Sequence, residues 1–217
     1  MKRQLVCALI YLATLSSAFA AEDVQPAPGS SDASTPVEES AAPIEVQKKP
    51  LHFVLGAGLT FGGDKLATVV YTDGSSDSIN AGDGLLFHAG LDYRIDEAFS
   101  FQGTLGFHMD VTKPAKNGDV AFTRIPLDLL AYYNINDAFR IGGGARIVSS
   151  PKLEGSGDAV NIQESFASTM GLVIEGEYMV GSTVGIKLRH VSESYKPTGS
   201  PVSIDGSHFG VLVNFYL

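Results

Sequence analysis

A histidine and a serine two residues apart are the clearest candidates for covalent chemistry in the sequence. His190 and Ser192 lie in the segment KLRHVSES, and Asp205 follows shortly downstream. A histidine can activate a serine hydroxyl as a nucleophile, and a carboxylate can orient the histidine. However, Glu193 after the serine supplies no donor for an oxyanion. Polar residues are also expected where a strand leaves a membrane, so the sequence favours a protein that is not an enzyme, with a lipid hydrolase as the alternative.

Charged side chains recur at alternate positions of several apolar segments, where they could pair with one another or line an ion pathway. Counting residues across short connections places Asp128 opposite Arg146 and Glu175 opposite Lys187. If these segments are strands that close around a narrow lumen, its small diameter favours packed ion pairs over conduction of ions. If positive charge is in excess, anion entry is expected near Arg124, Arg146 and Arg189. The predicted lumen charge network comprises Asp92, Arg94, Arg124, Asp128, Arg140, Arg146, Glu175, Glu177, Lys187 and Arg189.

Other ligand classes have little support in the sequence. The five histidines fall in different segments without the spacing of metal ligands, so no metal site is predicted. The glycines at 142–144 precede no expected helix and therefore indicate no phosphate loop. The net charge of −9 disfavours nucleic acid as a partner. No cofactor is expected.

The first 50 residues divide into two segments. Residues 1–20 combine Lys2 and Arg3, an apolar run and the ending Ala18-Phe19-Ala20, which is the pattern of a secretory signal peptide. Cys7 is the only cysteine and lies within this signal, so no disulfide is expected. Residues 21–50 lack aromatic residues and are rich in Pro, Ala, Ser and Glu, which predicts a disordered periplasmic linker.

From Leu51 to Leu217 the chain alternates apolar and polar residues with a period of two. A tilted strand needs roughly 9–11 residues to cross a membrane. The other face of these segments carries charges and glycines, which suits a closed lumen better than a soluble sheet. The pattern predicts an all-β fold, a transmembrane antiparallel up-and-down β-barrel of eight strands. The expected strands are 51–62, 84–95, 99–110, 123–135, 138–149, 168–179, 183–192 and 208–217.

Connection lengths predict the orientation in the membrane. Short connections near 96–97, 136–137 and 180–182 alternate with long ones at 63–83, 110–122, 150–167 and 193–206. Short periplasmic turns and long extracellular loops are the norm for such barrels, so the N-terminus is expected in the periplasm. The first long connection contains LATVVYT followed by Asp73-Gly74, which indicates a hairpin above the membrane. A barrel of ten strands is the alternative.

The last expected strand carries a sequence pattern that resembles one found in other proteins. Gly210, Val213, Phe215 and Leu217 resemble the C-terminal assembly signal of bacterial outer-membrane barrels, and IPLDLLAYYNI (125–135) resembles a strand of the small eight-stranded family that includes OmpA-, OmpX- and opacity-protein-like barrels. The resemblance implies a place in the Gram-negative outer membrane among lipid and lipopolysaccharide, and recognition of the C-terminal strand by the barrel-assembly machinery. It leaves the oligomeric state open.

This resemblance specifies a fold better than a function. We expect an envelope-structural or surface protein with extracellular loops, and a porin-like narrow channel or small-molecule conduit is the alternative. His190 and Ser192 also resemble the H-x-S of outer-membrane lipid A deacylases, in which Asn follows the serine in place of Glu193. The segment RIVSSPK (146–152) repeats RHVSESYK (189–196) with Ile147 in place of His190, which favours a shared strand-end motif.

Overall fold

The computed structural model describes residues 50–71, 74–112 and 118–217 of the 217-residue chain. The predicted signal peptide at 1–20, nearly all of the predicted linker at 21–50, and Asp73 of the predicted hairpin turn lie outside these residues. Within the described ranges, helices long and apolar enough to cross a membrane are absent. A short 3-10 turn, η1 (Gly157–Ala159), interrupts a structure that is otherwise built of strands.

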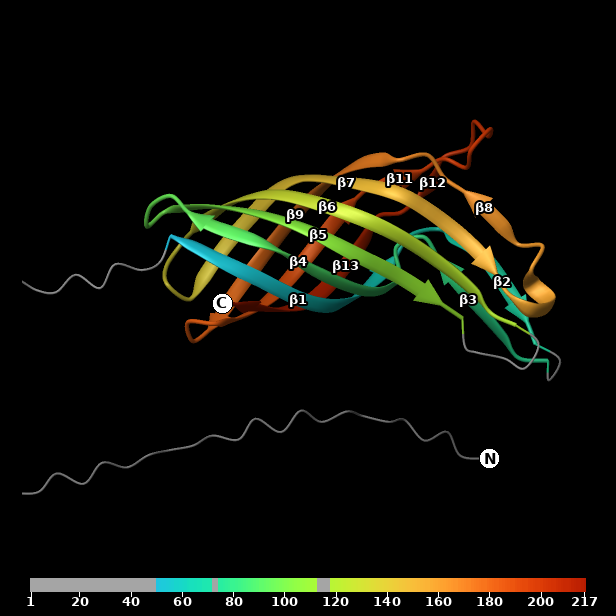
Figure 1. Cartoon of the computed structure of the whole chain (residues 1–217), viewed down its shortest axis with the longest axis horizontal. Coiled ribbons are helices and arrows are strands. Elements are labelled where there is room, and N and C mark those ends of the chain that lie inside the picture. The colour runs from blue at the N-terminus through green and yellow to red at the C-terminus, as the bar shows by residue number, and fades with distance from the viewer. Residues whose placement is uncertain (1–49, 72–73, 113–117) are drawn as a thin grey trace, which may run out of the picture. The chain divides into compact units, whose positions relative to one another are not determined.

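In this part of the chain, eight antiparallel strands close into a barrel (Figure 1). They are β1 (Leu51–Gly62), β4 (Gly84–Arg94), β5 (Phe99–Val111), β6 (Val120–Asn134), β7 (Phe139–Gly155), β9 (Thr169–Val180), β10 (Val184–Ser192) and β13 (His208–Tyr216). The first and last strands pair from Val54 opposite Tyr216 to Gly62 opposite His208. Every barrel strand thus has a hydrogen-bonded neighbour on both sides, which satisfies the backbone groups that lipid cannot. The predicted eight-stranded barrel is confirmed, and the ten-stranded alternative is wrong.

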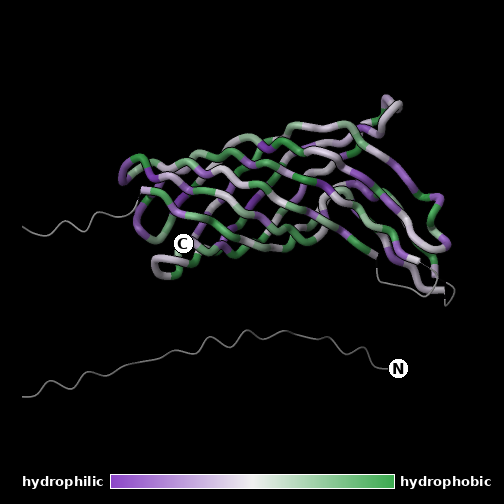
Figure 2. Tube along the Cα trace, viewed as in Figure 1, coloured by the Kyte–Doolittle hydropathy of each residue, from purple (hydrophilic) through white to green (hydrophobic). Residues whose placement is uncertain are grey.

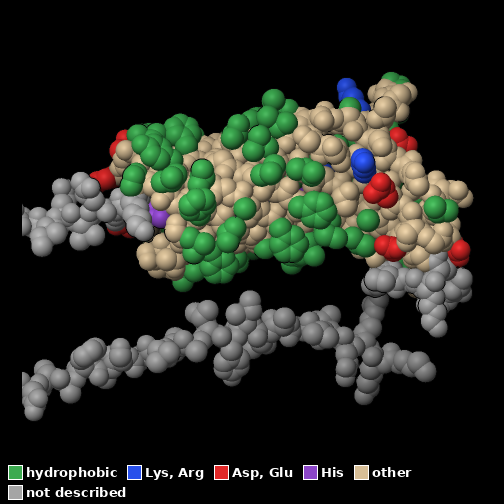
Figure 3. Space-filling model, in the orientation of Figure 1, with side chains coloured by type: hydrophobic (Ala, Val, Ile, Leu, Met, Phe, Trp, Pro, Cys, Tyr) green, Lys and Arg blue, Asp and Glu red, His purple; other side chains and the backbone are tan. Residues whose placement is uncertain are grey.

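Side chains alternate between the two faces of the barrel wall. Along β13 the odd-numbered residues from Phe209 to Phe215 are exposed, and the even-numbered residues from His208 to Tyr216 are buried. The same alternation of hydropathy follows the barrel strands in Figure 2. On the face that Figure 3 shows, apolar side chains are spread along the outer wall, and charged ones lie near its two ends. So large an exposed apolar surface requires a covering, which lipid supplies for a barrel of this kind.

Three tight connections define what we call the short-turn end of the barrel. The side chain of Asp96 accepts hydrogen bonds from the backbone N–H groups of Ala98 and Phe99, at 2.8 and 2.7 Å. Asn136 closes the second turn in the same way. The third turn uses Gly181 with a φ of 75°, a conformation that favours glycine. These polar, locally hydrogen-bonded turns let consecutive strands pair from their first residues onward.

The opposite end, which we call the long-loop end, contains folded structure of its own. A hairpin of β2 (Lys65–Val70) and β3 (Ser76–Asn80) forms a separate two-stranded sheet, so it adds no strand to the barrel. In the other loops, β8 (Gln163–Ser165) pairs with β7, and β11 (Ser194–Tyr195) pairs with β12 (Ile204–Asp205).

An apolar core lies between these loops and the ends of the barrel strands. We call it the loop core. Its buried members are Ile79, Ala81, Val120, Phe122, Val148, Leu153, Phe166 and Tyr195. The rings of Phe122, Phe166 and Tyr195 meet edge to face, with centroids 5.5–6.2 Å apart. Since β3, β6, β7 and β11 all contribute to it, the loop core fixes the loops to the barrel wall.

Candidate functional site

The interior of the barrel is the candidate site, because the predicted charges converge there. Nine of them are buried inside the wall: Asp92, Arg124, Asp128, Arg140, Arg146, Glu175, Glu177, Lys187 and Arg189. Arg94 is half-buried and lies at the short-turn end. Alternation brings the nine together, because each occupies an inward position of its strand.

Strand registers decide which charges meet. Asp128 lies opposite Arg146, as predicted. The predicted position of Glu175 opposite Lys187 is wrong, since Glu175 lies opposite Arg189 and Lys187 opposite Glu177, although the side chains of Glu175 and Lys187 still form an ion pair. The connection between β9 and β10 is centred one residue later than Gly181, and this shifts the register by two. A shift of two keeps every side chain on its predicted face, whereas a shift of one would reverse them all.

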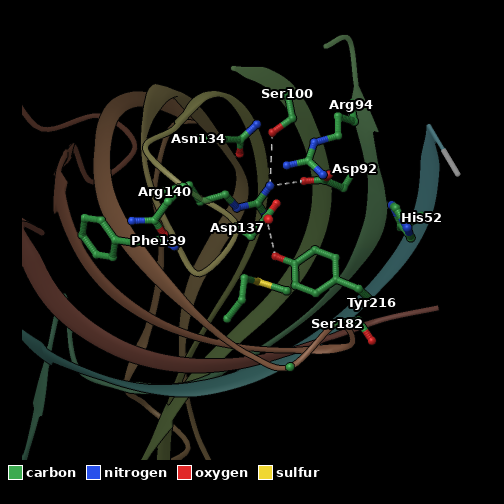
Figure 4. A pocket seen from close by; sticks show the side chains of 13 residues that line it. His52, Asp92, Arg94, Ser100, Asn134, Asp137, Phe139, Arg140, Ser182 and Tyr216 are labelled. Atoms are coloured by element: carbon green, nitrogen blue, oxygen red, sulfur yellow. Dashed lines mark hydrogen bonds and ion pairs between the residues drawn. The ribbon is translucent and has the colours of Figure 1, made fainter. Parts of the chain in front are cut away.

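The lumen layer nearest the short turns is built around Arg140. Its guanidinium pairs with Asp92 at 2.9 Å and with Glu177 at 2.7 Å. It also donates to the hydroxyl oxygens of Ser100 and Tyr216, at 3.2 and 2.6 Å, as the dashed lines in Figure 4 show. The hydroxyl of Tyr216 donates in turn to Glu177 at 2.6 Å. One arginine thus joins strands β4, β5, β7, β9 and β13 across the lumen.

The middle layer is built around Glu175 and two cations. Arg189 approaches one of its carboxylate oxygens at 2.6 Å, and Lys187 Nζ approaches the other at 2.7 Å. Arg189 also pairs with Asp128 at 2.8 Å, and the hydroxyl of Tyr132 donates to Glu175. These side chains bridge the lumen from β6 to β9 and β10. Neighbouring charges in the layer are therefore neutralised in pairs.

The upper layer lies below the loop core and is richer in nitrogen. Arg146 Nε lies 3.4 Å from Asp128 and 3.8 Å from Glu193, and its Nη1 donates to His208 at 3.3 Å. Arg124 Nε donates to His108 Nδ1 at 3.0 Å. Above this layer, Tyr195 donates to Glu193 at 2.6 Å. Burial raises the pKa of the Tyr195 phenol, which keeps it a hydrogen-bond donor.

Several interior residues lie outside the predicted charge network. They are uncharged or lie outside the predicted strands: Gln102, Tyr132, Glu193, Asn214 and Tyr216, with the histidines at 88, 108 and 208. Their even or odd position along each strand was the information available from the sequence, since it gives the face of the sheet on which a side chain lies. Tyr132 is an even-numbered residue of β6 like Asp128, and Tyr216 is an even-numbered residue of β13 like Asn214. Tyrosines at these positions supply hydroxyl groups to the charge network.

A cavity of about 450 Å³ opens at the short-turn end (Figure 4). Its lining includes His52, Arg94, Asn134 and Phe139, together with Arg140 and Tyr216 of the layer nearest the short turns. The residues that line it come from the short turns and the adjoining ends of the strands. The middle and upper layers contribute none of these lining residues, so we call the cavity the vestibule of the barrel.

The three residues of the catalytic alternative lie on the outside of the barrel near the long-loop end. The His190 ring stacks on Phe209, with centroids 4.5 Å apart, and Ser192 is exposed on the same strand face. Asp205 lies opposite Ser194, and the hydrogen bonds it accepts from Ser207 lower the pKa of its carboxyl group. Among the residues placed by the structure, no hydrogen bond joins His190 with Ser192 or Asp205.

The predicted assembly-signal residues occupy β13 and the residue after it. Val213, Phe215 and Leu217 are exposed on the outer face. Gly210 faces the lumen, where an added Cβ atom would meet the side chain of Thr60 at 3.2 Å. Groups of His, Cys, Asp and Glu suited to a metal ion are absent from the described ranges.

Three solved structures align with most of this chain. No curated protein sequence matches the chain. The structure of Ail from Yersinia pestis, in complex with the heparin analogue sucrose octasulfate, aligns with 77% of this chain and 97% of that chain at 12% identity and a TM-score of 0.50. Neisserial surface protein A aligns with 76% of this chain and 96% of its own (13% identity, TM-score 0.47). For OprG from Pseudomonas aeruginosa the shares are 77% and 96% (13% identity, TM-score 0.42).

At such low identity, the likeness to Ail shows a shared fold. The sequence also matches the family model described as "Outer membrane protein beta-barrel domain" over residues 40–215. That match covers the barrel up to Phe215, including the predicted charges of the lumen and the loops. The chain therefore belongs to the outer-membrane β-barrel domain family.

Proposed function

We propose that this outer-membrane barrel is a non-enzymatic, non-conducting protein of the cell envelope that presents its folded loops to the exterior. The filled lumen is the observation that carries the proposal. An interior of eight strands is just wide enough for side chains to fill it. Here ion pairs occupy the layer nearest the short turns and the middle layer, and the loop core lies over the upper layer.

The long-loop end faces outward in this proposal, and the short turns and the N-terminus face the periplasm, as is usual for such barrels. Lipid and lipopolysaccharide contact the apolar wall. The outer face of β13, which includes Phe215, meets the barrel-assembly machinery. The loop core supports an exterior role, because it holds four loops in one arrangement that a partner could recognise.

Planar-bilayer recording of the refolded protein tests the proposal. We expect no stepwise conductance from the wild type. A matched variant, Glu175→Ala with Lys187→Ala, removes one buried pair at constant net charge and controls for the contribution of the middle layer. Stable steps in the conductance of the wild-type protein, recorded in potassium chloride, would contradict the proposal.

A narrow conduit is the second candidate, and the vestibule at the short-turn end favours it. A conduit predicts that Arg140→Ala, which removes the floor of the vestibule, raises the conductance of an already conducting protein. Lipid hydrolysis is tested separately with Ser192→Ala. Loss of an acyl-hydrolase activity in that variant alone would overturn the non-enzymatic assignment.

A further inference from the structure

Strand β4 stops short of its two neighbours at the long-loop end of the barrel wall. β1, β4 and β5 are consecutive strands of that wall (Figure 1). At this end the last paired residue of β4 is Gly84 on the side of β1 and Leu85 on the side of β5. β1 continues past this point to Gly62, and β5 continues to Val111. The sheet is therefore incomplete between the ends of β1 and β5, and we call this gap the notch.

A cavity of about 420 Å³ lies at the notch. Ligand pockets in proteins have volumes of roughly 300–1,000 Å³, so this cavity is large enough for a small molecule. Its apolar lining comes from outward-facing positions of the three strands, namely Leu59, Phe61, Leu85, Met109 and Val111. All of these except Met109 are exposed. The cavity therefore opens on the face of the wall that lipid covers, where a hydrocarbon chain can enter it.

Packed side chains lie behind the cavity, on the side of the lumen. The hydroxyl of Thr60, which also lines the cavity, donates to the Gly84 carbonyl at 3.3 Å and lies 2.7 Å from His108 Nε2. Arg124 Nη2 donates to the backbone oxygen of Asp83 at 3.1 Å. Thr60, His108 and Arg124 are each at most 1% exposed. A ligand therefore reaches the cavity from the lipid side.

Two half-buried carboxylates stand at the polar edge of the cavity, Asp83 and Asp110. The two carboxylate oxygens of Asp83 accept hydrogen bonds from the backbone N–H of Gly62 and from the side-chain amide of Asn80, each at 2.6 Å. Asp110 accepts a longer bond, of 3.3 Å, from the backbone N–H of Asn80. A carboxylate offers about four acceptor positions, so Asp110 keeps capacity for a further donor.

The charges of the lumen leave these two carboxylates without compensation. Arg124 interacts electrostatically with Asp110 from the lumen side. However, the buried lumen charges already balance, with five bases (Arg124, Arg140, Arg146, Lys187 and Arg189) and five acids (Asp92, Asp128, Glu175, Glu177 and Glu193). Asp83 and Asp110 add two negative charges, and the described residues that line the cavity include no Lys or Arg. The notch thus joins an apolar surface to an excess of negative charge, which is complementary to a cation that carries a hydrocarbon chain.

We propose that the notch binds a cationic amphiphile, a primary amine on a single hydrocarbon chain, which enters from the surrounding lipid. The ammonium group donates to Asp110, next to Asp83, and the chain lies along Phe61, Leu85 and Met109. Hydrogen bonds between ionised partners are stronger than those between neutral ones. An alcohol with the same chain is therefore bound more weakly, and an alkyl sulfate is repelled.

Fluorescence quenching tests this site, because the chain contains no Trp and one introduced Trp is a unique reporter. Phe107→Trp places the reporter on the outer face of β5, two residues before Met109 and outside the cavity lining. Leu172→Trp places it on the outer face of β9, which is four strands from β4 in both directions around the barrel. The full chain with either reporter is refolded into phosphatidylcholine vesicles. The probes are dodecylammonium, dodecanol and dodecyl sulfate, each with a nitroxide on its chain.

We expect dodecylammonium to quench Phe107→Trp at a concentration about tenfold lower than dodecanol requires. Leu172→Trp reports how each probe partitions into the bilayer, so the ratio of the two reporters removes that difference. After this correction, equal quenching of Phe107→Trp by the ammonium and the alcohol would overturn the proposal. Stronger quenching by the sulfate would overturn it as well.

Two further variants of the Phe107→Trp protein locate the charge that the amine recognises. Asp110→Asn should abolish the preference for dodecylammonium over dodecanol. Asp158→Asn removes an exposed acid of η1 that does not line the cavity, and it should retain the preference. Heat-modifiable migration on gels verifies that each variant is folded. A preference that persists in folded Asp110→Asn would overturn the assignment.

Should Asp110→Asn fail to fold, competition in the Phe107→Trp protein decides the matter. Unlabelled dodecylammonium is expected to displace the labelled ammonium probe and restore the fluorescence of the reporter. Equal displacement by the same concentration of unlabelled dodecanol would overturn the proposal, because the site would then recognise the chain and not the charge.

Discussion

At the scale of single residues, the interior of this barrel is a set of charges whose partners are fixed by strand position. Asp128 illustrates this, since it lies opposite Arg146 in register and also pairs with Arg189 at 2.8 Å. A charge held in this way is satisfied only while both neighbours remain. Removing one member therefore leaves buried positive charge without compensation.

We expect Asp128→Ala to lower the free energy of unfolding by about 3–5 kcal/mol, because breaking a buried pair strands its partner. The control is Asp158→Ala, which removes an exposed acid of η1 in a long loop. Urea titration of both variants in micelles measures the difference. Matching urea midpoints for the two variants would show that Asp128 is not part of a buried network.

At the scale of elements, β13 unites closure and lipid contact. Its inward residues enter the lumen network, its outward residues meet lipid, and its backbone pairs with β1 and β10. Phe215 lies opposite Leu55 and Val184, on the outer face. A substitution there leaves the lumen contacts intact and changes only the surface that an assembly partner or lipid would meet.

We expect Phe215→Asp to block assembly. The lipid-facing cost of an acidic side chain is small near an interface, and the larger loss is of the C-terminal recognition pattern implied by the family resemblance. Heat-modifiable migration on gels reports folding, and Val202→Asp, at an exposed loop position, is the control. Normal amounts of folded Phe215→Asp in the outer membrane would refute the proposed role of β13 in assembly.

At the scale of the whole molecule, the two ends of the barrel differ in construction. The short-turn end is closed by locally hydrogen-bonded turns around an open vestibule. The long-loop end carries the loop core and three pieces of additional strand pairing. Each end also has an exposed glycine turn where an inserted peptide tag would disturb little of the packing.

We expect an epitope inserted after Gly199 to be detected on intact cells, and one inserted after Gly181 to be detected only in permeabilised cells. Both glycines have positive φ values, 85° and 75°, and a Cβ atom added at either would point into open space, so insertion costs little packing. Antibody labelling measures the outcome. The reverse labelling pattern would invert the proposed orientation.

The sequence alone predicted the barrel, because alternation with a period of two between an apolar and a charged face favours a closed transmembrane wall over a soluble sheet. It therefore also determined which side of the wall Asp128, Glu175 and Phe215 occupy, since parity survives a register shift of two. The predicted hairpin in the first loop followed from equally local signals.

Only the tertiary structure decided how the two faces are completed. The register of Glu175 depended on where the β9–β10 turn is centred, which residue types left open. The loop core joins Ile79, Phe122 and Tyr195 from distant segments, and the position of Arg124 between His108 and Phe122 depends on strand stagger around the closed barrel. Such contacts arise between residues far apart in the chain, and local periodicity carries no information about them.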